Sequence, residues 1–244
     1  NGPAKYRLDW PDYGRYDGDF RYFLHRQSIA FGENWEMSQI TQWVASRDFD
    51  PSSAEPVALL LHGYGSNERD LPGIMDYLPA IPWVSLRAPE QSPHGGYAWS
   101  QITNPGNPEA GVVEPATETI WHWIEDNIHP GAPLVLIGFS QGGLMATQLL
   151  RTRPERIKAT VILAGFTMAA EQPADATLMT AKPKLIYCRG KQDQVISAEA
   201  VARTNSWLQA HTRAITKTYD GLGHSVDQRV LADVSGYLEV ALPS

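Results

Sequence analysis

Residues 134–143 decide the fold, and they read Leu134-Val135-Leu136-Ile137-Gly138-Phe139-Ser140-Gln141-Gly142-Gly143. The apolar run at the start is typical of a short buried strand. A helical pattern follows directly, carried by Leu144, Met145, Ala146, Leu149 and Leu150. Gly-x-Ser-x-Gly lies between the two and must form a tight turn. We therefore expect a strand, a sharp turn and a helix in immediate succession.

The turn at Ser140 has the composition that a nucleophilic serine requires. A serine on a sharp strand-to-helix turn needs small neighbours, and Gly138 and Gly142 supply that room. Gly143 lets the helix begin close to the strand. The first amides of the helix then point at the position where negative charge develops during acyl transfer. An incidental serine in a glycine-rich turn is the alternative, and the flanking strand and helix favour the nucleophile.

Composition excludes several classes of protein. The chain has 244 residues, 43% of them hydrophobic, which is enough for one large α/β domain or two small ones. A net charge of −7 disfavours nucleic acid or an anionic membrane surface as the main partner. No apolar run approaches the roughly 20 residues of a membrane-spanning helix. Cys188 is the single cysteine and cannot form an intrachain disulfide, so we expect a cytoplasmic protein.

Apolar strand patterns alternate with helical patterns from Pro56 onward. This order predicts an α/β fold with a mostly parallel, doubly wound sheet, formed by one domain that spans residues 1–244. Residues 1–50 are expected to hold an N-terminal extension and one or two antiparallel edge strands. The expected strands are 20–25, 40–45, 56–61, 83–86, 134–139, 159–164, 184–188 and 215–219. Apart from the helix after Ser140, the expected helices are 68–78, 115–128, 198–209 and 225–240.

Two polar residues are suited to activate Ser140. A serine hydroxyl needs a base, and the base needs an anion that orients it. Asp193 follows the strand at 184–188, and His224 follows the strand at 215–219. The carboxyl ends of parallel strands share one edge of the sheet, so we expect both side chains beside Ser140. The alternatives are a solvated turn aspartate and a helix-capping histidine.

Other acids and histidines fit these roles less well. Asp220 is too close to His224 in sequence to orient it, and Glu199 falls inside an expected helix. His94, in the long loop over residues 87–114, could line the site. His62 is expected to brace the glycine turn that it begins, rather than to act as the base.

Backbone amides are expected to bind the oxyanion. One is the amide of Gln141, the residue after the nucleophile. The other comes from the loop after the strand at 56–61, where Tyr64 lies between Gly63 and Gly65. Glycine on both sides lets this backbone approach a substrate closely.

Four motifs together resemble the phospholipase/carboxylesterase family of α/β-hydrolases, which includes small bacterial carboxylesterases and is related to acyl-protein thioesterases. They are His62-Gly63-Tyr64-Gly65, Gly138-Phe139-Ser140-Gln141-Gly142-Gly143, Gly190 with Asp193 and Val195, and Gly223-His224-Ser225. The similarity extends from about Pro56 to the C-terminus. It implies a triad of Ser140, Asp193 and His224, with the oxyanion bound by Tyr64 and Gln141. Tyr97-Ala98-Trp99 is similar to the family's aromatic substrate loop, but Ser100 follows where many relatives carry a second aromatic residue.

The expected function is hydrolysis of small carboxylic esters with short or medium acyl chains, through an acyl-enzyme. Only a short segment separates the strands at 159–164 and 184–188, so no cap domain is expected. Trp99 and Phe166 are expected to wall the acyl pocket. No cofactor and no metal are expected. An acyl thioesterase, a lysophospholipase, a peptidase, an acyltransferase and a non-catalytic binding module are the alternatives, and a homodimer is left open.

Overall fold

The computed structural model of the chain describes residues 21–24, 39–102 and 106–242. Eight strands form one sheet in the order β1-β2-β4-β3-β7-β8-β9-β10, and two short strands, β5 and β6, form a separate ladder. The strands are β1 (Arg21–Leu24), β2 (Gln42–Ala45), β3 (Val57–Leu61), β4 (Trp83–Leu86), β5 (Glu90–Gln91), β6 (Tyr97–Ala98), β7 (Leu134–Phe139), β8 (Ile157–Leu163), β9 (Lys184–Gly190) and β10 (Arg213–Tyr219).

Strands β4, β3, β7, β8, β9 and β10 run parallel to one another. The two outermost strands next to β4, β1 and β2, are joined by antiparallel pairing. Every residue of β3 and β7 is buried, as expected of central strands covered on both faces. Because the carboxyl ends of these strands meet at one edge, the loops that follow them can meet there as well. This edge carries the candidate site.

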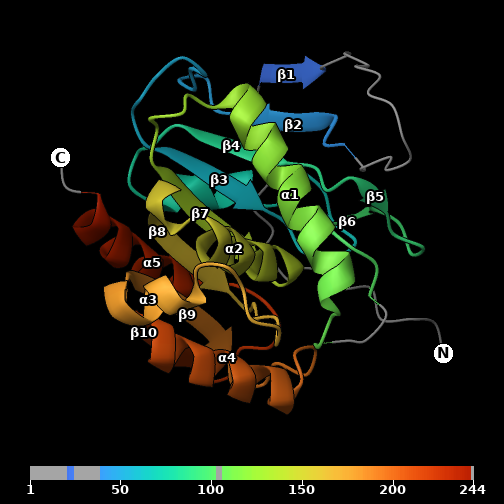
Figure 1. Cartoon of the computed structure of the whole chain (residues 1–244), viewed down its shortest axis with the longest axis vertical. Helices are drawn as coiled ribbons and strands as arrows, with labels where there is room; N and C mark the ends of the chain where they lie inside the picture. The colour runs from blue at the N-terminus through green and yellow to red at the C-terminus, as the bar shows by residue number, and fades with distance from the viewer. Residues whose placement is uncertain (1–20, 25–38, 103–105, 243–244) are drawn as a thin grey trace.

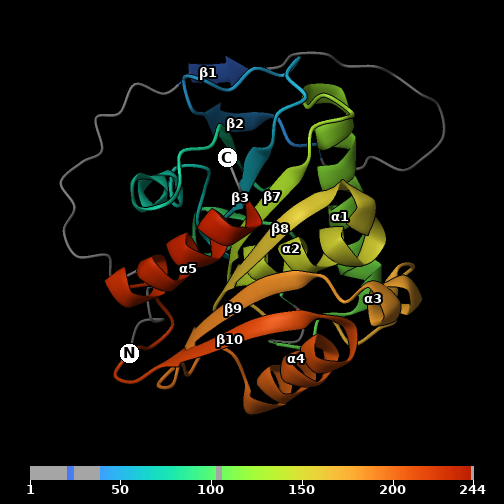
Figure 2. The ribbon, with the colours of Figure 1, turned by 90° about the vertical axis from the view of Figure 1, so that its left-hand side faces the viewer.

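The helices lie in two layers. They are α1 (Ala110–Asn127), α2 (Gln141–Thr152), α3 (Asp175–Ala181), α4 (Ala198–His211) and α5 (Gln228–Ala241), with 3-10 helices η1 (Pro72–Tyr77) and η2 (Pro154–Arg156). Apolar side chains of α1, α2, α3 and α4 pack on one face of the sheet, and those of η1 and α5 pack on the other. Figure 1 looks onto the face that carries α1 and α2, and Figure 2 shows α5 on the opposite side.

The predicted fold class is confirmed, with local differences. The expected helix at 68–78 is the shorter η1, which begins at Pro72 because proline fits a first helical turn but lacks the N–H that an interior position needs. Helix α1 begins at Ala110 rather than at Pro115, which it accommodates in its interior. Helix α3 was not predicted. It is the one helix in the described segment between β8 and β9.

In the N-terminal region, β1 and β2 pair antiparallel and lie at the end of the strand order. The rest of the expected N-terminal extension falls in residues 1–20 and 25–38, outside the described residues. Within the described part of the chain, every helix is too short or too polar to span a bilayer.

Candidate active site

Ser140 occupies a strained turn between β7 and α2. Its backbone has φ 55° and ψ −115°, a positive-φ conformation that costs an L-residue roughly 1–3 kcal/mol. The turn is held on both sides, since the Ser140 N–H donates to the Leu163 carbonyl and the Ser140 carbonyl accepts from the Leu144 N–H. The hydroxyl is thereby presented at the carboxyl edge of the sheet.

Close backbone contacts explain the glycine at position 142. A Cβ there would lie 1.8 Å from the Leu61 carbonyl oxygen, at the end of β3. Only glycine therefore allows the first turn of α2 to rest against β3. This contact brings the loop after β3 next to the nucleophile, where an ideal Cβ on Gly63 would be 3.4 Å from the Ser140 Cβ.

The structure brings Ser140, His224 and Asp193 together from three separate loops. His224 Nε2 lies 2.8 Å from Ser140 Oγ, and His224 Nδ1 lies 2.8 Å from Asp193 Oδ2. The His224 side chain is 12% exposed and that of Asp193 is fully buried. An unbroken path of hydrogen bonds thus runs from the buried carboxylate to the serine hydroxyl.

Asp193 is held in its charged form. Burial opposes ionisation, but the hydrogen bond and the charge of His224 and the amides of Val195 and Ile196 keep the pKa of Asp193 below its usual value. Both of these amides donate to Oδ1, at 2.9 and 3.2 Å, which leaves Oδ2 for the imidazole. Asp220, by contrast, is 79% exposed and pairs with Lys191.

Hydrogen bonds to Tyr97 anchor the loop after β3 just beyond Tyr64. The Gly65 N–H donates to the Tyr97 carbonyl, and the Tyr97 N–H donates to the Ser66 carbonyl, so this loop forms a small bridge with the aromatic loop. Gly65 has φ 77°, a conformation that glycine adopts without strain. Tyr64 itself is half-buried.

His62 orients the peptide group that carries the Tyr64 amide. His62 Nε2 accepts from the Ala88 N–H, so the ring proton is on Nδ1, which donates to the Gly63 carbonyl at 2.7 Å. In a trans peptide the N–H points away from the carbonyl. Fixing the Gly63 carbonyl therefore also fixes the direction of the Tyr64 N–H. Complete burial lowers the pKa of His62 to about 4, and the neutral ring that this role needs is the stable form.

The chain is similar to known proteins over most of its length. A sequence model of the phospholipase/carboxylesterase family matches residues 50–242. The chain belongs to this family. Its predicted class, a serine hydrolase of the carboxylesterase type, is thereby confirmed.

The similar proteins include esterases and thioesterases. Acyl-protein thioesterase 1 of Kluyveromyces lactis is 24% identical over 217 residues, 78% of this chain and 95% of the relative. Esterase YpfH of Escherichia coli K12 is 26% identical over 202 residues, 78% of this chain and 84% of the relative. The crystal structure of the Bacillus cereus carboxylesterase superposes with a TM-score of 0.70 at 19% identity, over 82% of this chain and 94% of that one. The crystal structure of Arabidopsis thaliana SOBER1 superposes with a TM-score of 0.65 at 19% identity, over 77% of this chain and 99% of that one.

The two aromatic residues expected to wall the acyl pocket of this carboxylesterase-family chain are both largely buried. Trp99 is 1% exposed and Phe166 is 7% exposed, and both belong to the apolar cluster beneath α1 and α2. The indole N–H of Trp99 donates to the His62 carbonyl at 2.8 Å. Little of either side chain is left for a substrate to touch, and their role as pocket walls stays a prediction.

One group of side chains at this edge was missed by the sequence analysis. Glu68, 3% exposed, pairs with Arg87 through two hydrogen bonds of 2.5 and 2.6 Å. Arg87 also donates to the Tyr97 hydroxyl and lies over the Tyr97 ring. The group joins the loop after β3 to the aromatic loop. The available signals were Arg87, a charged residue directly after β4, and Glu68, an acidic residue in the loop that follows β3.

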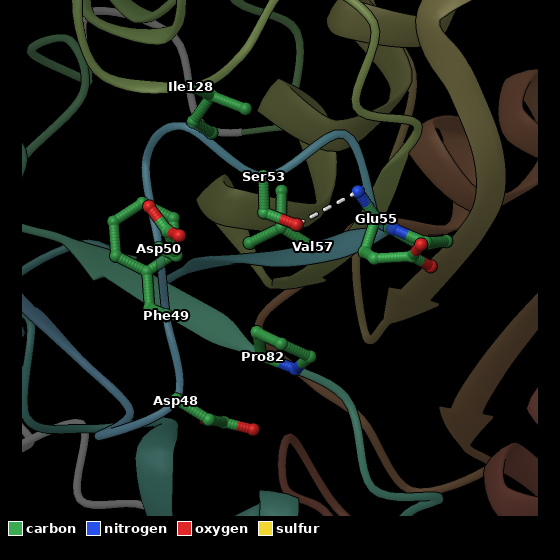
Figure 3. Close-up of a pocket in the computed structure, with 9 residues that line it drawn as sticks. Asp48, Phe49, Asp50, Ser53, Glu55, Val57, Pro82 and Ile128 are labelled. Carbon is green, nitrogen blue, oxygen red and sulfur yellow. Dashed lines mark hydrogen bonds between the residues drawn. The ribbon is translucent and has the colours of Figure 1, made fainter.

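A separate pocket of about 220 Å³ opens at the other edge of the sheet, near the first residue of β3 (Figure 3). It is lined by Asp48, Phe49, Asp50, Ser53, Glu55, Pro56, Val57, Pro82 and Ile128. Since Ser140 lies at the carboxyl ends of the strands, this pocket has no part in the chemistry of the triad. Among the described residues, no group of three or more His, Cys, Asp or Glu side chains is arranged to hold a metal ion.

Proposed function

We propose that this family member hydrolyses carboxylic esters through an acyl-enzyme on Ser140, with His224 as the base and Asp193 as its orienting anion. One observation carries the proposal: the two 2.8 Å hydrogen bonds that join Asp193, His224 and Ser140. A serine, a histidine and a buried carboxylate in this order form the arrangement that makes a hydroxyl nucleophilic near neutral pH.

In the acylation step, His224 Nε2 takes the proton from Ser140 Oγ while Oγ attacks the ester carbonyl carbon. The electron pair of the carbonyl moves to its oxygen, and the ionised Asp193 stabilises the imidazolium that forms. When the carbon–oxygen bond to the alcohol breaks, Nε2 returns its proton to the departing alkoxide. Water then attacks the acyl-enzyme by the same route, which releases the acid and restores Ser140.

The backbone amides of Tyr64 and Gln141 are proposed to bind the negatively charged oxygen of the tetrahedral intermediate. The Tyr64 N–H is oriented by the His62–Gly63 hydrogen bond described above, and the Gln141 N–H belongs to the first turn of α2. Donors that are fixed before the reaction do not need to reorganise as charge develops, and the loss of one such donor lowers kcat by about 10²–10³.

Substrates with acyl chains of about two to eight carbons are proposed to fit best. The described segment between β8 and β9 holds α3 and no further helix, so this segment contributes no cap that would enclose a long chain. Each methylene that stays in water forgoes about 0.8 kcal/mol of burial, so affinity stops rising once the pocket is full. A thioester is the second candidate, because an acyl-protein thioesterase is among the similar proteins.

A substrate panel with the parent enzyme and Ser140→Ala tests the proposal. We expect p-nitrophenyl esters of short acids to be turned over with the highest kcat/KM, and a fluorophosphonate probe to label one site. Ser140→Ala is expected to abolish both turnover and labelling. Labelling that survives in Ser140→Ala would contradict the assignment of the nucleophile. Higher kcat/KM on matched acyl thioesters would favour the second candidate.

A further inference from the structure

The side chain of Gln141 joins the nucleophile turn to the aromatic loop. Gln141 is 5% exposed, and both ends of its amide are paired. Oε1 accepts from the Trp99 N–H at 3.0 Å, and Nε2 donates to the Ser100 carbonyl at 2.7 Å. The reaction proposed above uses only the backbone N–H of Gln141, so these two hydrogen bonds have no part in it so far.

Trp99 continues this connection to the other oxyanion donor. Its indole N–H donates to the His62 carbonyl at 2.8 Å, and its ring lies 5.3 Å from the imidazole of His62. That imidazole fixes the Gly63 carbonyl, which belongs to the same peptide group as the Tyr64 N–H. A path of buried contacts therefore leads from the Gln141 side chain through Trp99 and His62 to the Tyr64 amide.

We infer that the Gln141 side chain is a positioning residue which, through Trp99, sets the separation of the two oxyanion donors. The inference rests on the proposed function, since it assigns a purpose to the side chain of a residue whose backbone binds the oxyanion. Gln141 supplies one donor itself and holds the loop that leads to the other. Buried hydrogen bonds of this kind fix geometry, and a misplacement of about 1 Å at a reacting centre can cost about 10²-fold in rate.

The chain offers a matched control for each variant. Gln148 lies on the same helix, is fully buried, and pairs with Gln172 and Arg151 rather than with the aromatic loop. Trp121 is also fully buried and donates its indole N–H to Thr152 in α2. Gln148→Met and Trp121→Phe therefore remove equivalent buried hydrogen bonds away from the oxyanion donors.

The test measures kcat and KM for p-nitrophenyl acetate and the inhibition constant of a trifluoromethyl ketone, which forms a tetrahedral oxyanion on the serine. We expect Gln141→Met to lower kcat about 10- to 100-fold and Trp99→Phe about 10-fold, with KM within about threefold of the parent. The ketone should bind more weakly by a similar factor. Gln148→Met and Trp121→Phe should leave kcat within about threefold.

A double variant tests whether the two residues act along one path. Gln141→Met combined with Trp99→Phe should cost little more than the larger single change, because the first substitution already releases the loop. If the two losses multiply, or if Gln148→Met lowers kcat as much as Gln141→Met, the inference is wrong. The same holds if Gln141→Met leaves kcat and ketone binding unchanged.

Two further results keep the inference separate from other failures. If Gln141→Met does not fold, Trp99→Phe against Trp121→Phe decides the question alone. Turnover that persists in Ser140→Ala would overturn the proposed function. An inactive Ser140→Ala together with a fully active Gln141→Met would overturn only the role of the Gln141 side chain.

Discussion

Arg151 and Asp175 form a buried, two-pronged ion pair, with Nε to Oδ1 at 2.9 Å and Nη2 to Oδ2 at 2.6 Å. Their side chains are 1% and 8% exposed. Arg151 also donates to the carbonyls of Met168 and Ala170 in the segment that follows β8. The pair thereby ties helix α2, which begins directly after Ser140, to the segment between β8 and α3.

Asp175→Asn should destabilise the protein by about 3 kcal/mol or more, because it leaves a buried guanidinium without its counter-ion. Burial opposes ionisation of Asp175, but the Arg151 hydrogen bonds keep its pKa below the usual value. The contribution of the pair is therefore present near neutral pH and is lost as the pH falls through the lowered pKa. Urea unfolding near pH 7 measures the effect.

The exposed pair of Arg153 and Glu125, whose side chains are 33% and 45% exposed, is the control. Solvent screens such a pair, so Glu125→Gln should cost about 1 kcal/mol or less. Equal losses in Glu125→Gln and Asp175→Asn would contradict the special role of the buried pair.

Asp193→Asn should lower kcat by roughly 10⁴, because an amide in place of the carboxylate favours the wrong tautomer of His224. Asp220→Asn removes a carboxylate of the same neighbourhood that pairs with Lys191 at the surface, and it should change kcat far less. Steady-state kinetics on one p-nitrophenyl ester compares the two variants. A larger loss in Asp220→Asn would reassign the acid.

The arrangement of Ser140, Asp193 and His224 could be predicted because the topology of the sheet determines where each residue lies. Each residue follows a strand, and a parallel sheet brings the carboxyl ends of its strands to one edge. The need for glycine in the serine turn could also be predicted, because the chain passes close to β3 there. Local sequence therefore contained enough information for the geometry of the triad.

The supporting contacts could not be predicted in the same way. The Gln141 side chain pairs with residues about 40 positions away, and Glu68 pairs with Arg87, which follows η1 and β4 in the chain. Such partners depend on how the loops pack against one another, and the periodic pattern of apolar residues in the sequence does not predict them. The helix expected at 68–78 was overestimated because Pro72 fits only the first turn of a helix, so the helix begins there rather than at Glu68.

Gly142→Ala should destabilise the protein or prevent folding, since its Cβ would overlap the Leu61 carbonyl at 1.8 Å. Gly236 in α5 is the matched control, because an added Cβ there meets nothing within 4 Å. Gly236→Ala should stabilise the protein by up to about 1 kcal/mol through helix propensity. Thermal unfolding of both variants checks the contrast. A fully stable Gly142→Ala would show that α2 can shift away from β3.

The buried ring of His62 makes the stability of the folded protein depend on pH. Burial lowers the pKa of His62 from 6.5 to about 4, so the folded protein keeps this ring neutral where the unfolded chain binds a proton. Stability rises with pH wherever the unfolded state binds more protons. The contribution of His62 is therefore intact above about pH 6.5 and is lost as the pH falls toward about 4, a loss of roughly 2–3 kcal/mol.

Replacement of the ring isolates this effect. His62→Gln should be less stable than the parent at about pH 7.5, because the hydrogen bonds to Gly63 and Ala88 are disturbed, and the difference should shrink by roughly 2–3 kcal/mol toward about pH 4.5. The exposed His122 in α1 gives the control, His122→Gln, which should change the stability at about pH 7.5 by no more than about 0.5 kcal/mol. Urea unfolding across this range measures all three proteins. A constant gap between the parent and His62→Gln would mean that the His62 ring becomes protonated inside the folded protein, and the neutral donor assigned to the Gly63–Tyr64 peptide would then be wrong.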